Sequence, residues 1–376
     1  MKPREIFRPG SFDRPLFIIT LLLVIIGLIM IFSSSALVAS EKYHHPFHFL
    51  LEQLKGAILG FILMAFIIFT PRDLFHWSTF IFGLLILCLV LLSLCFLMPP
   101  LSGANRWVMA FGITFQPSEL TKIALVLFIA FYLEKKREHL DEIKTILLLL
   151  AVIGFFTLLI LREPDLGTAL LILFISFLLL YMGRIKIRYL GAAVALALAF
   201  FLFYFLQLPR EDYRRQRLEA FFWPEEHRAR AAFQIMQSKL AVGTGGFLGV
   251  GLGESTRKLY FLPCAHTDFI YAIIGEEFGL VGTISVLALY LLFFWRGWQI
   301  ARKATNQAHQ LVAYGLTLMT CCQALVNISI VLALGPTKGV PLPFISYGRS
   351  ALLCQLVSVG LLLNISQRKV DHLFLK

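Results

Sequence analysis

Long apolar runs, separated by polar segments, follow one another along the whole chain. A helix needs about 20 apolar residues to cross the hydrocarbon core of a bilayer. Runs near this length lie at 15–38, 54–70, 76–98, 119–133, 145–161, 167–182, 189–207, 269–295, 310–333 and 347–365. Helices are expected because open strands leave backbone groups unsatisfied in lipid, and the alternation of barrel strands is absent. The pattern predicts an all-α, polytopic membrane protein with about ten transmembrane helices.

The composition agrees with this prediction. Hydrophobic residues make up 59% of the chain and charged residues 15%, whereas soluble domains are about half apolar and a quarter charged. The formal net charge is +12, but the basic residues lie between the apolar runs, without interleaved stacking aromatics. We therefore expect membrane lipids as partners, and no nucleic acid. The six cysteines are scattered without a Cys-x-x-Cys pair, which favours neither a disulfide framework nor a zinc site.

Lysine and arginine are distributed unequally between alternate polar segments. The short segments that face outward if the N-terminus is cytoplasmic contain Lys42, Arg106, Arg162 and Lys338. The inward segments contain many more, so the positive-inside rule predicts cytoplasmic tails at 1–14 and 367–376. The first apolar run is longer than the h-region of a signal peptide, which favours an uncleaved helix. We expect one integral membrane domain, 1–376.

The segment 208–268 is predicted to be a large extracytoplasmic loop between helices 7 and 8. It begins with a charged stretch that includes Arg214 and Arg215, continues into a plausible amphipathic helix at 231–240, and ends with a glycine-rich run. No Gly-Lys-Ser/Thr follows these glycines, which excludes a P-loop. Two interpretations remain open: a loop folded over the membrane surface, or a lid over a binding site for a lipid headgroup.

Three clusters of ionisable residues lie in or beside the apolar runs, where each charge costs roughly 2.5–3.5 kcal/mol. In the first cluster, Glu119 and Lys122 are three residues apart and share a helix face, downstream of Arg106. They form either an ordinary ion pair near a helix start or the polar wall of a substrate cavity. In the second cluster, 162–165, Asp165 either caps the next helix or belongs to a carboxylate pair, with Glu163, beside a headgroup site.

The third cluster lies where the long loop returns to the membrane. His266 and Asp268 precede an apolar run, and Glu276 and Glu277 lie two turns further along it. A partly desolvated carboxylate at Asp268 suits a general base or a ligand for a divalent cation. The alternative is an N-cap aspartate beside an interfacial histidine. The cost of burying Glu276 and Glu277 predicts partners among the basic residues.

A fourth segment, 336–348, contains three prolines and two glycines, which prevent a regular helix. Non-helical backbone at membrane depth survives only where it is buried or lines a cavity. Lys338 and Ser346 are therefore candidate substrate contacts, Lys338 as a phosphate ligand.

Five stretches of the sequence resemble the SEDS family (shape, elongation, division and sporulation). They are RWVMAFGITFQPSELTK, EPDLGT, QSKLAVGTGGFLGVGLGES, KLYFLPCAHTDFIYAIIGEEFGLVG and PTKGVPLPFISYG. They follow the family's order and extend from Arg106 to beyond Tyr347. The PTKG and KLYFLP…AHTDF stretches are more similar to the cell-division branch than to the elongation branch.

The resemblance implies a ten-helix fold with a large outer loop, in the bacterial cytoplasmic membrane. It implies peptidoglycan glycosyltransferase activity on lipid II, in complex with a class B penicillin-binding protein and other divisome proteins. The family's essential HTDF aspartate corresponds to Asp268, its QPSE glutamate and following lysine to Glu119 and Lys122, and its arginine before tryptophan to Arg106. Two positions depart from the family pattern: Cys264 replaces a frequent glutamate, and Arg349 replaces a usual glycine.

These residues lead to one principal hypothesis and two alternatives. In the principal hypothesis Asp268 deprotonates the acceptor sugar, and the cations Arg106, Lys122, Arg214, Arg215 and Lys338 stabilise the leaving pyrophosphate. Mg²⁺ or Mn²⁺ at Asp268 is an optional cofactor. The alternatives are a lipid II flippase and a non-catalytic scaffold that activates a penicillin-binding protein.

Overall fold

The computed structural model consists almost entirely of helices. It describes residues 5–7, 10–71, 78–99, 105–110, 113–207, 209, 212, 215, 230–258, 262–263, 265–336 and 339–370. The helices are α1 (Arg14–Tyr43), α2 (His48–Phe69), α3 (Ser78–Cys95), α4 (Pro117–Lys135), α5 (Ile143–Arg162), α6 (Leu166–Met182), α7 (Ile187–Gln207), α9 (Arg230–Thr244), α10 (Ile270–Arg302), α11 (Gln307–Val331) and α12 (Arg349–Ser366), with a 3-10 turn at Arg137–His139. Each predicted apolar run coincides with a helix, and α9 corresponds to the predicted amphipathic helix.

The sequence signals at the helix starts explain several of these boundaries. Asp13 caps α1 by accepting a hydrogen bond from Leu16 N at 3.0 Å, ahead of Pro15 in the first turn. Pro117 occupies the first turn of α4, and Asn306 caps α11 through His309 N. Because polar residues continue a helix beyond the hydrocarbon region, α1 and α10 extend several residues past their apolar runs.

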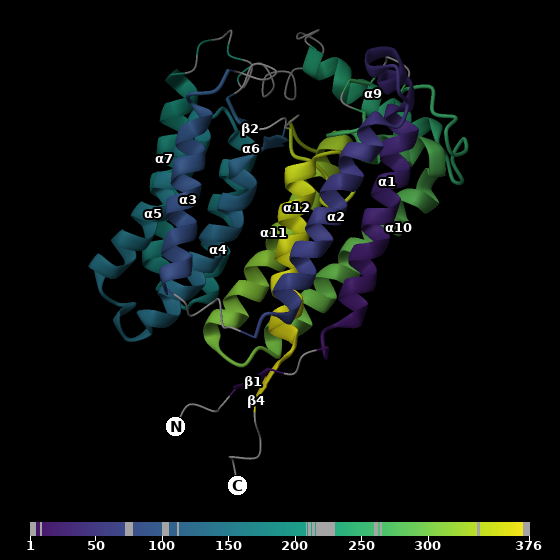
Figure 1. The fold of residues 1–376 in the computed structure, drawn as a ribbon. Helices are drawn as coiled ribbons and strands as arrows, with labels where there is room; N and C mark the ends of the chain where they lie inside the picture. The colour runs from purple at the N-terminus through teal and green to yellow at the C-terminus, as the bar shows by residue number, and fades with distance from the viewer. Residues whose placement is uncertain are drawn as a thin grey trace.

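The helices pack in two groups that lie side by side in Figure 1. One group contains α1, α2, α10, α11 and α12, with the most extensive packing between α2 and α12. The other contains α3, α4, α5 and α6, with α7 beside α6. Because α11 packs against both α4 and α6, it joins the two groups.

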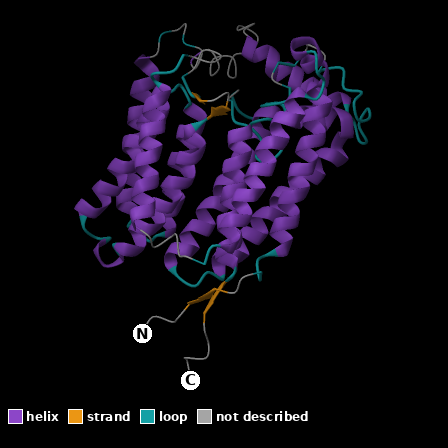
Figure 2. Ribbon diagram, in the orientation of Figure 1, coloured by secondary structure: helices purple, strands orange, loops and turns teal. Residues whose placement is uncertain are grey.

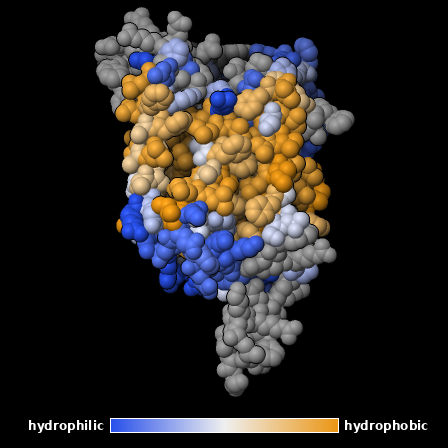
Figure 3. Space-filling view, turned by 90° about the vertical axis from the view of Figure 1, so that its left-hand side faces the viewer, coloured by the Kyte–Doolittle hydropathy of each residue, from blue (hydrophilic) through white to orange (hydrophobic). Residues whose placement is uncertain are grey.

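The outer surface is apolar around the middle of the bundle. Figure 3 shows a broad hydrophobic band between more hydrophilic ends. Within the described residues, eight helices are long and apolar enough to cross a membrane. They include α1, α7 and α10 but not α4, whose first and last turns are charged, nor the shorter α6. The protein is thus a multi-pass membrane protein, and the count of ten spans stays a prediction.

Four three-residue strands were not expected in an all-α fold. β1 (Glu5–Phe7) pairs antiparallel with β4 (Arg368–Val370) at the end of the bundle that carries both termini. β2 (Val108–Ala110) pairs with β3 (Ile113–Phe115) at the opposite end (Figure 2). Strands this short show too little alternation to be recognised in a sequence. They decorate the ends and leave the helical core unchanged.

The longest helix, α10, is interrupted near its start. Gly279 has φ 63° and ψ −153°, values outside the helical region. The glycine-rich segment before it fills the break: Val250 N and Gly251 N donate to the carbonyls of Glu276 and Glu277, each at 3.0 Å. Glycine is required here because a Cβ on Gly249 would lie only 2.2 Å from the Glu277 carbonyl oxygen. The glycine run is therefore packed against α10.

Candidate functional site

The predicted site residues that the structure describes gather at the end of the bundle opposite the termini. Asp268 is half-buried in the turn that leads into α10. The helix N-cap is Phe269, so the alternative interpretation of Asp268 as the cap is wrong. A Cβ built on Gly339 would lie 3.4 Å from Asp268 Oδ2, which places the carboxylate against the segment between α11 and α12.

The two non-helical segments, 265–268 and 339–347, are joined by hydrogen bonds. Tyr347 N donates to the His266 carbonyl at 3.0 Å. Ser346 Oγ donates to the Thr267 carbonyl at 2.5 Å and accepts from Leu342 N at 2.8 Å. The hydroxyl of Ser346, predicted as a substrate contact, is therefore engaged with backbone groups of the site. As expected for non-helical backbone at this depth, much of the second segment is buried.

His266 lies among aromatic rings. The ring centroids of Phe49 and Tyr347 are 4.7 and 5.8 Å from that of His266. Burial lowers the pKa of His266 to about 4, since a protonated imidazole loses its hydration there. At neutral pH His266 is therefore an uncharged hydrogen-bonding group beside Asp268.

Glu119 and Lys122 form a buried ion pair on α4. Lys122 Nζ lies 2.9 Å from Glu119 Oε1, and the two side chains are only 3% and 2% exposed. Lys122 Nζ also donates to Gln323 Oε1 on α11 at 2.7 Å. The interpretation as an intrahelical ion pair is confirmed, and the pair additionally links the two helix groups.

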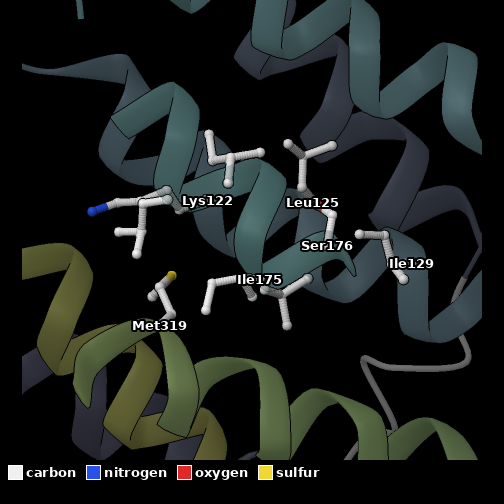
Figure 4. Close-up of a pocket in the computed structure, with 9 residues that line it drawn as sticks. Lys122, Leu125, Ile129, Ile175, Ser176 and Met319 are labelled. Atoms are coloured by element: carbon white, nitrogen blue, oxygen red, sulfur yellow. The ribbon is translucent and has the colours of Figure 1, made fainter. Parts of the chain in front are cut away.

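A narrow apolar pocket extends from Lys122 into the bundle (Figure 4). The lining residues come from α4, α6 and α11 and include Leu125, Ile129, Ile175, Ser176 and Met319. Apart from Lys122 and Ser176 its walls are hydrocarbon, so the interior of the bundle beyond Lys122 is apolar.

The second cluster lies at the junction of α5 and α6. Asp165 caps α6 by accepting from Thr168 N at 3.1 Å, which confirms the capping interpretation, and it also accepts from Gln116 Nε2 at 3.1 Å. Glu163 is 0% exposed. Burial, assisted by the Asp165 carboxylate, raises the pKa of Glu163 to about 8, although Cys95 and Arg106 act in the opposite direction. Arg106 Nε is buried and has no hydrogen-bond partner among the described residues.

Glu276 and Glu277 anchor the glycine-rich segment to α10. Lys258 Nζ lies 2.7 Å from Glu277 Oε1, which confirms a basic partner for that residue. For Glu276 the prediction of a basic partner is wrong within the described part of the chain. Its carboxylate instead accepts from Ser255 Oγ at 2.5 Å and from Thr256 N at 3.0 Å. Both glutamates therefore have structural partners.

Of the other residues singled out from the sequence, the structure describes Arg215 and Arg349. Arg215 lies near α7, 6.0 Å from the Phe205 ring centroid. Arg214, Lys338 and Cys264 lie outside the described residues. Arg349 forms an ion pair with Glu52 of α2 and lies 3.4 Å from Thr114 Oγ1 of β3. This departure from the family pattern thus connects the starts of α2 and α12 to the β2–β3 hairpin.

Sequence reasoning missed three buried amides that hold this site. Gln53 of α2 donates to the Ser346 carbonyl at 3.2 Å and accepts from Gly348 N at 3.0 Å. Gln323 and Asn327 of α11 bond to the segment after α11. The available signal was an uncharged polar residue just before one apolar run (Gln53) and two inside another (Gln323 and Asn327), which is weaker than a charge in the same place.

Among the described residues no group of three or more His, Cys, Asp and Glu side chains could hold a metal ion. A site for Mg²⁺ or Mn²⁺ at Asp268 therefore stays a prediction, which no cluster of described ligand side chains supports.

Comparisons with known proteins agree with this geometry. A family model for FtsW, RodA and SpoVE, described as cell cycle protein, matches residues 13–371. The chain is 39% identical to a probable peptidoglycan glycosyltransferase FtsW of Geobacter metallireducens over 95% of both chains. It is 36% identical to stage V sporulation protein E of Bacillus subtilis, over 94% of this chain and 97% of that one.

A solved structure of a peptidoglycan synthase complex, in which polymerization and crosslinking are coordinated, contains a similar chain. The TM-score is 0.76 at 26% identity, over 95% of this chain and 98% of that one. With the motifs, the helical architecture and nearly full-length matches in agreement, the chain belongs to the FtsW, RodA and SpoVE family of cell cycle proteins, the SEDS family.

Proposed function

We propose that this protein is a peptidoglycan glycosyltransferase that polymerises lipid II, with Asp268 as its general base. The observation that carries the proposal is the placement of Asp268. Its carboxylate faces Gly339 where two hydrogen-bonded non-helical segments meet, at the end opposite the termini. The similarity over 95% of the chain to a probable peptidoglycan glycosyltransferase supports the reaction class.

The proposed reaction joins two lipid-linked sugars. Asp268 accepts the proton of the acceptor's 4-hydroxyl as its oxygen forms a bond to the anomeric carbon of the donor. The bond between that carbon and the pyrophosphate oxygen breaks, and polyprenyl pyrophosphate leaves with the bonding electrons. A positioned general base contributes about 10²–10⁴-fold to such a step. The carboxylate must be ionised to act as the base.

The leaving pyrophosphate requires positive charge nearby. Glu119 already neutralises Lys122, which suits Lys122 to forming a polar wall more than to binding phosphate. Arg106 has an unbonded buried Nε within the described structure, and we assign it the first role in stabilising the leaving group. Arg214, Arg215 and Lys338 are further candidates, and Ser346 and the neutral His266 shape the site.

The orientation and partners belong to the same proposal. Lys135, Arg184, Lys186 and Arg302 lie at the ends of helices on the side that carries the termini. The positive-inside rule supports a cytoplasmic location for that side, in a bacterial inner membrane, and an outer-leaflet location for Asp268. The similarity to a chain of a peptidoglycan synthase complex supports a class B penicillin-binding protein as partner, together with other divisome proteins.

The distribution of buried charge favours polymerisation over lipid II transport. Glu119, Lys122, Glu163 and Glu277 all lie toward the end that carries Asp268. A transport path open to both sides would also need buried carboxylates toward the other end, where the structure describes buried Arg368 and His309 but no buried Asp or Glu. A scaffold that only activates a penicillin-binding protein needs no carboxylate at Asp268, and this distinguishes it from an enzyme.

Replacement of Asp268 by alanine tests the proposal. The purified protein with its penicillin-binding partner is supplied with purified lipid II, and glycan strands are measured. We expect no polymer from Asp268→Ala, with membrane insertion and partner binding unchanged. If Asp268→Ala forms polymer at the wild-type rate, Asp268 is not the general base. Labelled lipid II that crosses proteoliposomes without polymer would support the flippase, and normal division with Asp268→Ala would support the scaffold.

A further inference from the structure

Asn327 lies on α11, one turn before the helix ends, and its amide group bridges the two halves of the candidate site. The side chain is 1% exposed. Its Nδ2 donates to the Asp268 carbonyl oxygen at 2.8 Å and to the Val340 carbonyl oxygen at 2.8 Å. Neither carbonyl belongs to a helix, so each needs a hydrogen-bond donor when it is buried. The side-chain amide of Asn327 donates to both carbonyls and so connects the two segments.

The other end of this amide is unsatisfied. Asn327 Oδ1 is buried and has no hydrogen-bond partner among the described residues. An unmade hydrogen bond of a buried acceptor costs about 1–3 kcal/mol. A residue retained only for stability is usually fully bonded, and exceptions in native proteins call for an explanation. The arrangement therefore favours a role in the site over a purely structural one.

Gln323, one turn earlier on the same helix face, extends the connection. Its Nε2 donates to the Pro341 carbonyl at 3.0 Å, and its Oε1 accepts from Lys122 Nζ at 2.7 Å. The 339–347 segment is thus fixed to α11 at two successive turns. Of the two amides, Asn327 is the one that reaches the backbone of Asp268 itself.

We infer that Asn327 is a positioning residue for the reaction: it fixes the backbone of Asp268 so that the carboxylate meets the acceptor hydroxyl. This inference rests on the proposed function of Asp268. A general base acts within about 2.6–3.2 Å of the proton it accepts, and a misplacement of about 1 Å costs roughly 100-fold in rate. Asn327 acts through Asp268 and touches no substrate. Loss of its two donors frees the Asp268 turn from the 339–347 segment.

The chain contains a closely matched control. Asn364 on α12 is 2% exposed, and its Nδ2 likewise donates to two backbone carbonyls, those of Ile67 at 2.8 Å and Thr70 at 2.9 Å. It lies at the end that carries the termini, far from Asp268 along the bundle. Its Oδ1 is satisfied by Arg368 Nε at 3.2 Å. Asn327→Ala and Asn364→Ala therefore remove similar bonds, one at the site and one away from it.

The test compares wild type, Asn327→Ala, Asn364→Ala and Asp268→Ala, each purified with the partner and assayed on purified lipid II. Turnover at saturating lipid II, KM, lipid II binding and the thermal midpoint are measured. For Asn327→Ala we expect turnover to fall roughly 10–100-fold, while KM and lipid II binding change less than about threefold. Asn364→Ala should lower the thermal midpoint similarly and change turnover less than about threefold. If Asn327→Ala does not fold, Asn327→Ser, which keeps one donor, replaces it with the same expectation of direction.

The outcomes separate this inference from the proposed function. If Asp268→Ala is inactive but the Asn327 variant has the same turnover as Asn364→Ala, Asn327 has no positioning role, while Asp268 remains the proposed general base. A loss at Asn327 that appears only in KM and lipid II binding also contradicts it. If Asp268→Ala retains wild-type activity, the proposed function fails and the inference fails with it.

Discussion

The described ion pairs at the end with the termini are exposed or half-buried, whereas the end that carries Asp268 also contains two fully buried pairs, Lys122–Glu119 and Lys258–Glu277. At the former end Lys186 and Asp141 lie 2.8 Å apart with both side chains largely in solvent. Near Asp268, Lys258 and Glu277 lie 2.7 Å apart and are 6% and 0% exposed. Exposed pairs contribute about 0–1 kcal/mol, while burial of a pair is expensive and demands good geometry. The difference indicates that charges at the end with the termini are hydrated by solvent, whereas the end with Asp268 keeps some charges paired inside an apolar surrounding.

The largest effect on stability is expected from breaking the buried pair. Among the described residues, Lys258→Met leaves the Glu277 carboxylate with one hydrogen-bond partner, the Ser33 hydroxyl at 2.7 Å. Loss of one member of a buried pair costs about 3–5 kcal/mol. Unfolding in detergent measures this loss, and the double variant Lys258→Met with Glu277→Gln should recover part of it. Lys186→Met, its match at the other end, should cost less than about 1 kcal/mol. Equal losses at the two ends would break the comparison.

A somewhat smaller effect is expected at the interruption of α10. Gly279→Ala forces a side chain into φ 63° and places its Cβ 2.5 Å from Gly249 N. A non-glycine residue in such a conformation costs about 1–3 kcal/mol, with the clash in addition. Gly83→Ala in α3, where a Cβ meets nothing within 4 Å, should be neutral or stabilising by about 0.5–1 kcal/mol. Thermal unfolding of the two variants checks this. A Gly279→Ala variant as stable as wild type would contradict the close packing of the glycine-rich segment against α10.

The protonation of the buried Glu163 carboxyl is expected to make the stability of the protein depend on pH. Its folded-state pKa of about 8 exceeds the ordinary value of 4.5, so the folded protein binds an extra proton between these values. The stability that this group contributes should therefore be complete below about pH 4.5, fall as pH rises from there to about 8, and change no further above pH 8. Glu163→Gln, which does not titrate, should match wild type at pH 5 and exceed it at pH 9. A parallel pH profile for both proteins would contradict the buried neutral carboxyl.

The smallest effect is expected at Arg349, the partly exposed departure from the family pattern. Arg349→Gly removes its ion pair with Glu52 and its contact with Thr114. The expected loss is about 1 kcal/mol or less, with polymerisation within about twofold of wild type. Thermal midpoint and lipid II turnover test this. A loss above about tenfold in turnover would contradict this and show that Arg349 contributes to the reaction.

The sequence predicted the helices well because apolar runs of bilayer length have few alternatives in lipid. It also located α9 and the cap at Asp165, whose signals are local. It did not predict the break at Gly279, since the loop that fills it is distant in sequence. The same reason explains Asn327 and Gln323: neither residue type nor spacing reveals which carbonyl an amide meets. Only the folded chain shows that Glu276 accepts from Ser255 in place of a basic residue.

The central claim, that the Asp268 carboxylate takes a proton during polymerisation, is tested most directly by an isosteric change. Asp268→Asn keeps size and polarity and removes the base, and Asp141→Asn makes the same change at an exposed position near the termini. With purified lipid II and the partner protein, we predict a loss of roughly 10²–10⁴-fold in glycan polymerisation for Asp268→Asn and none for Asp141→Asn. Wild-type polymerisation by folded Asp268→Asn protein would contradict the account.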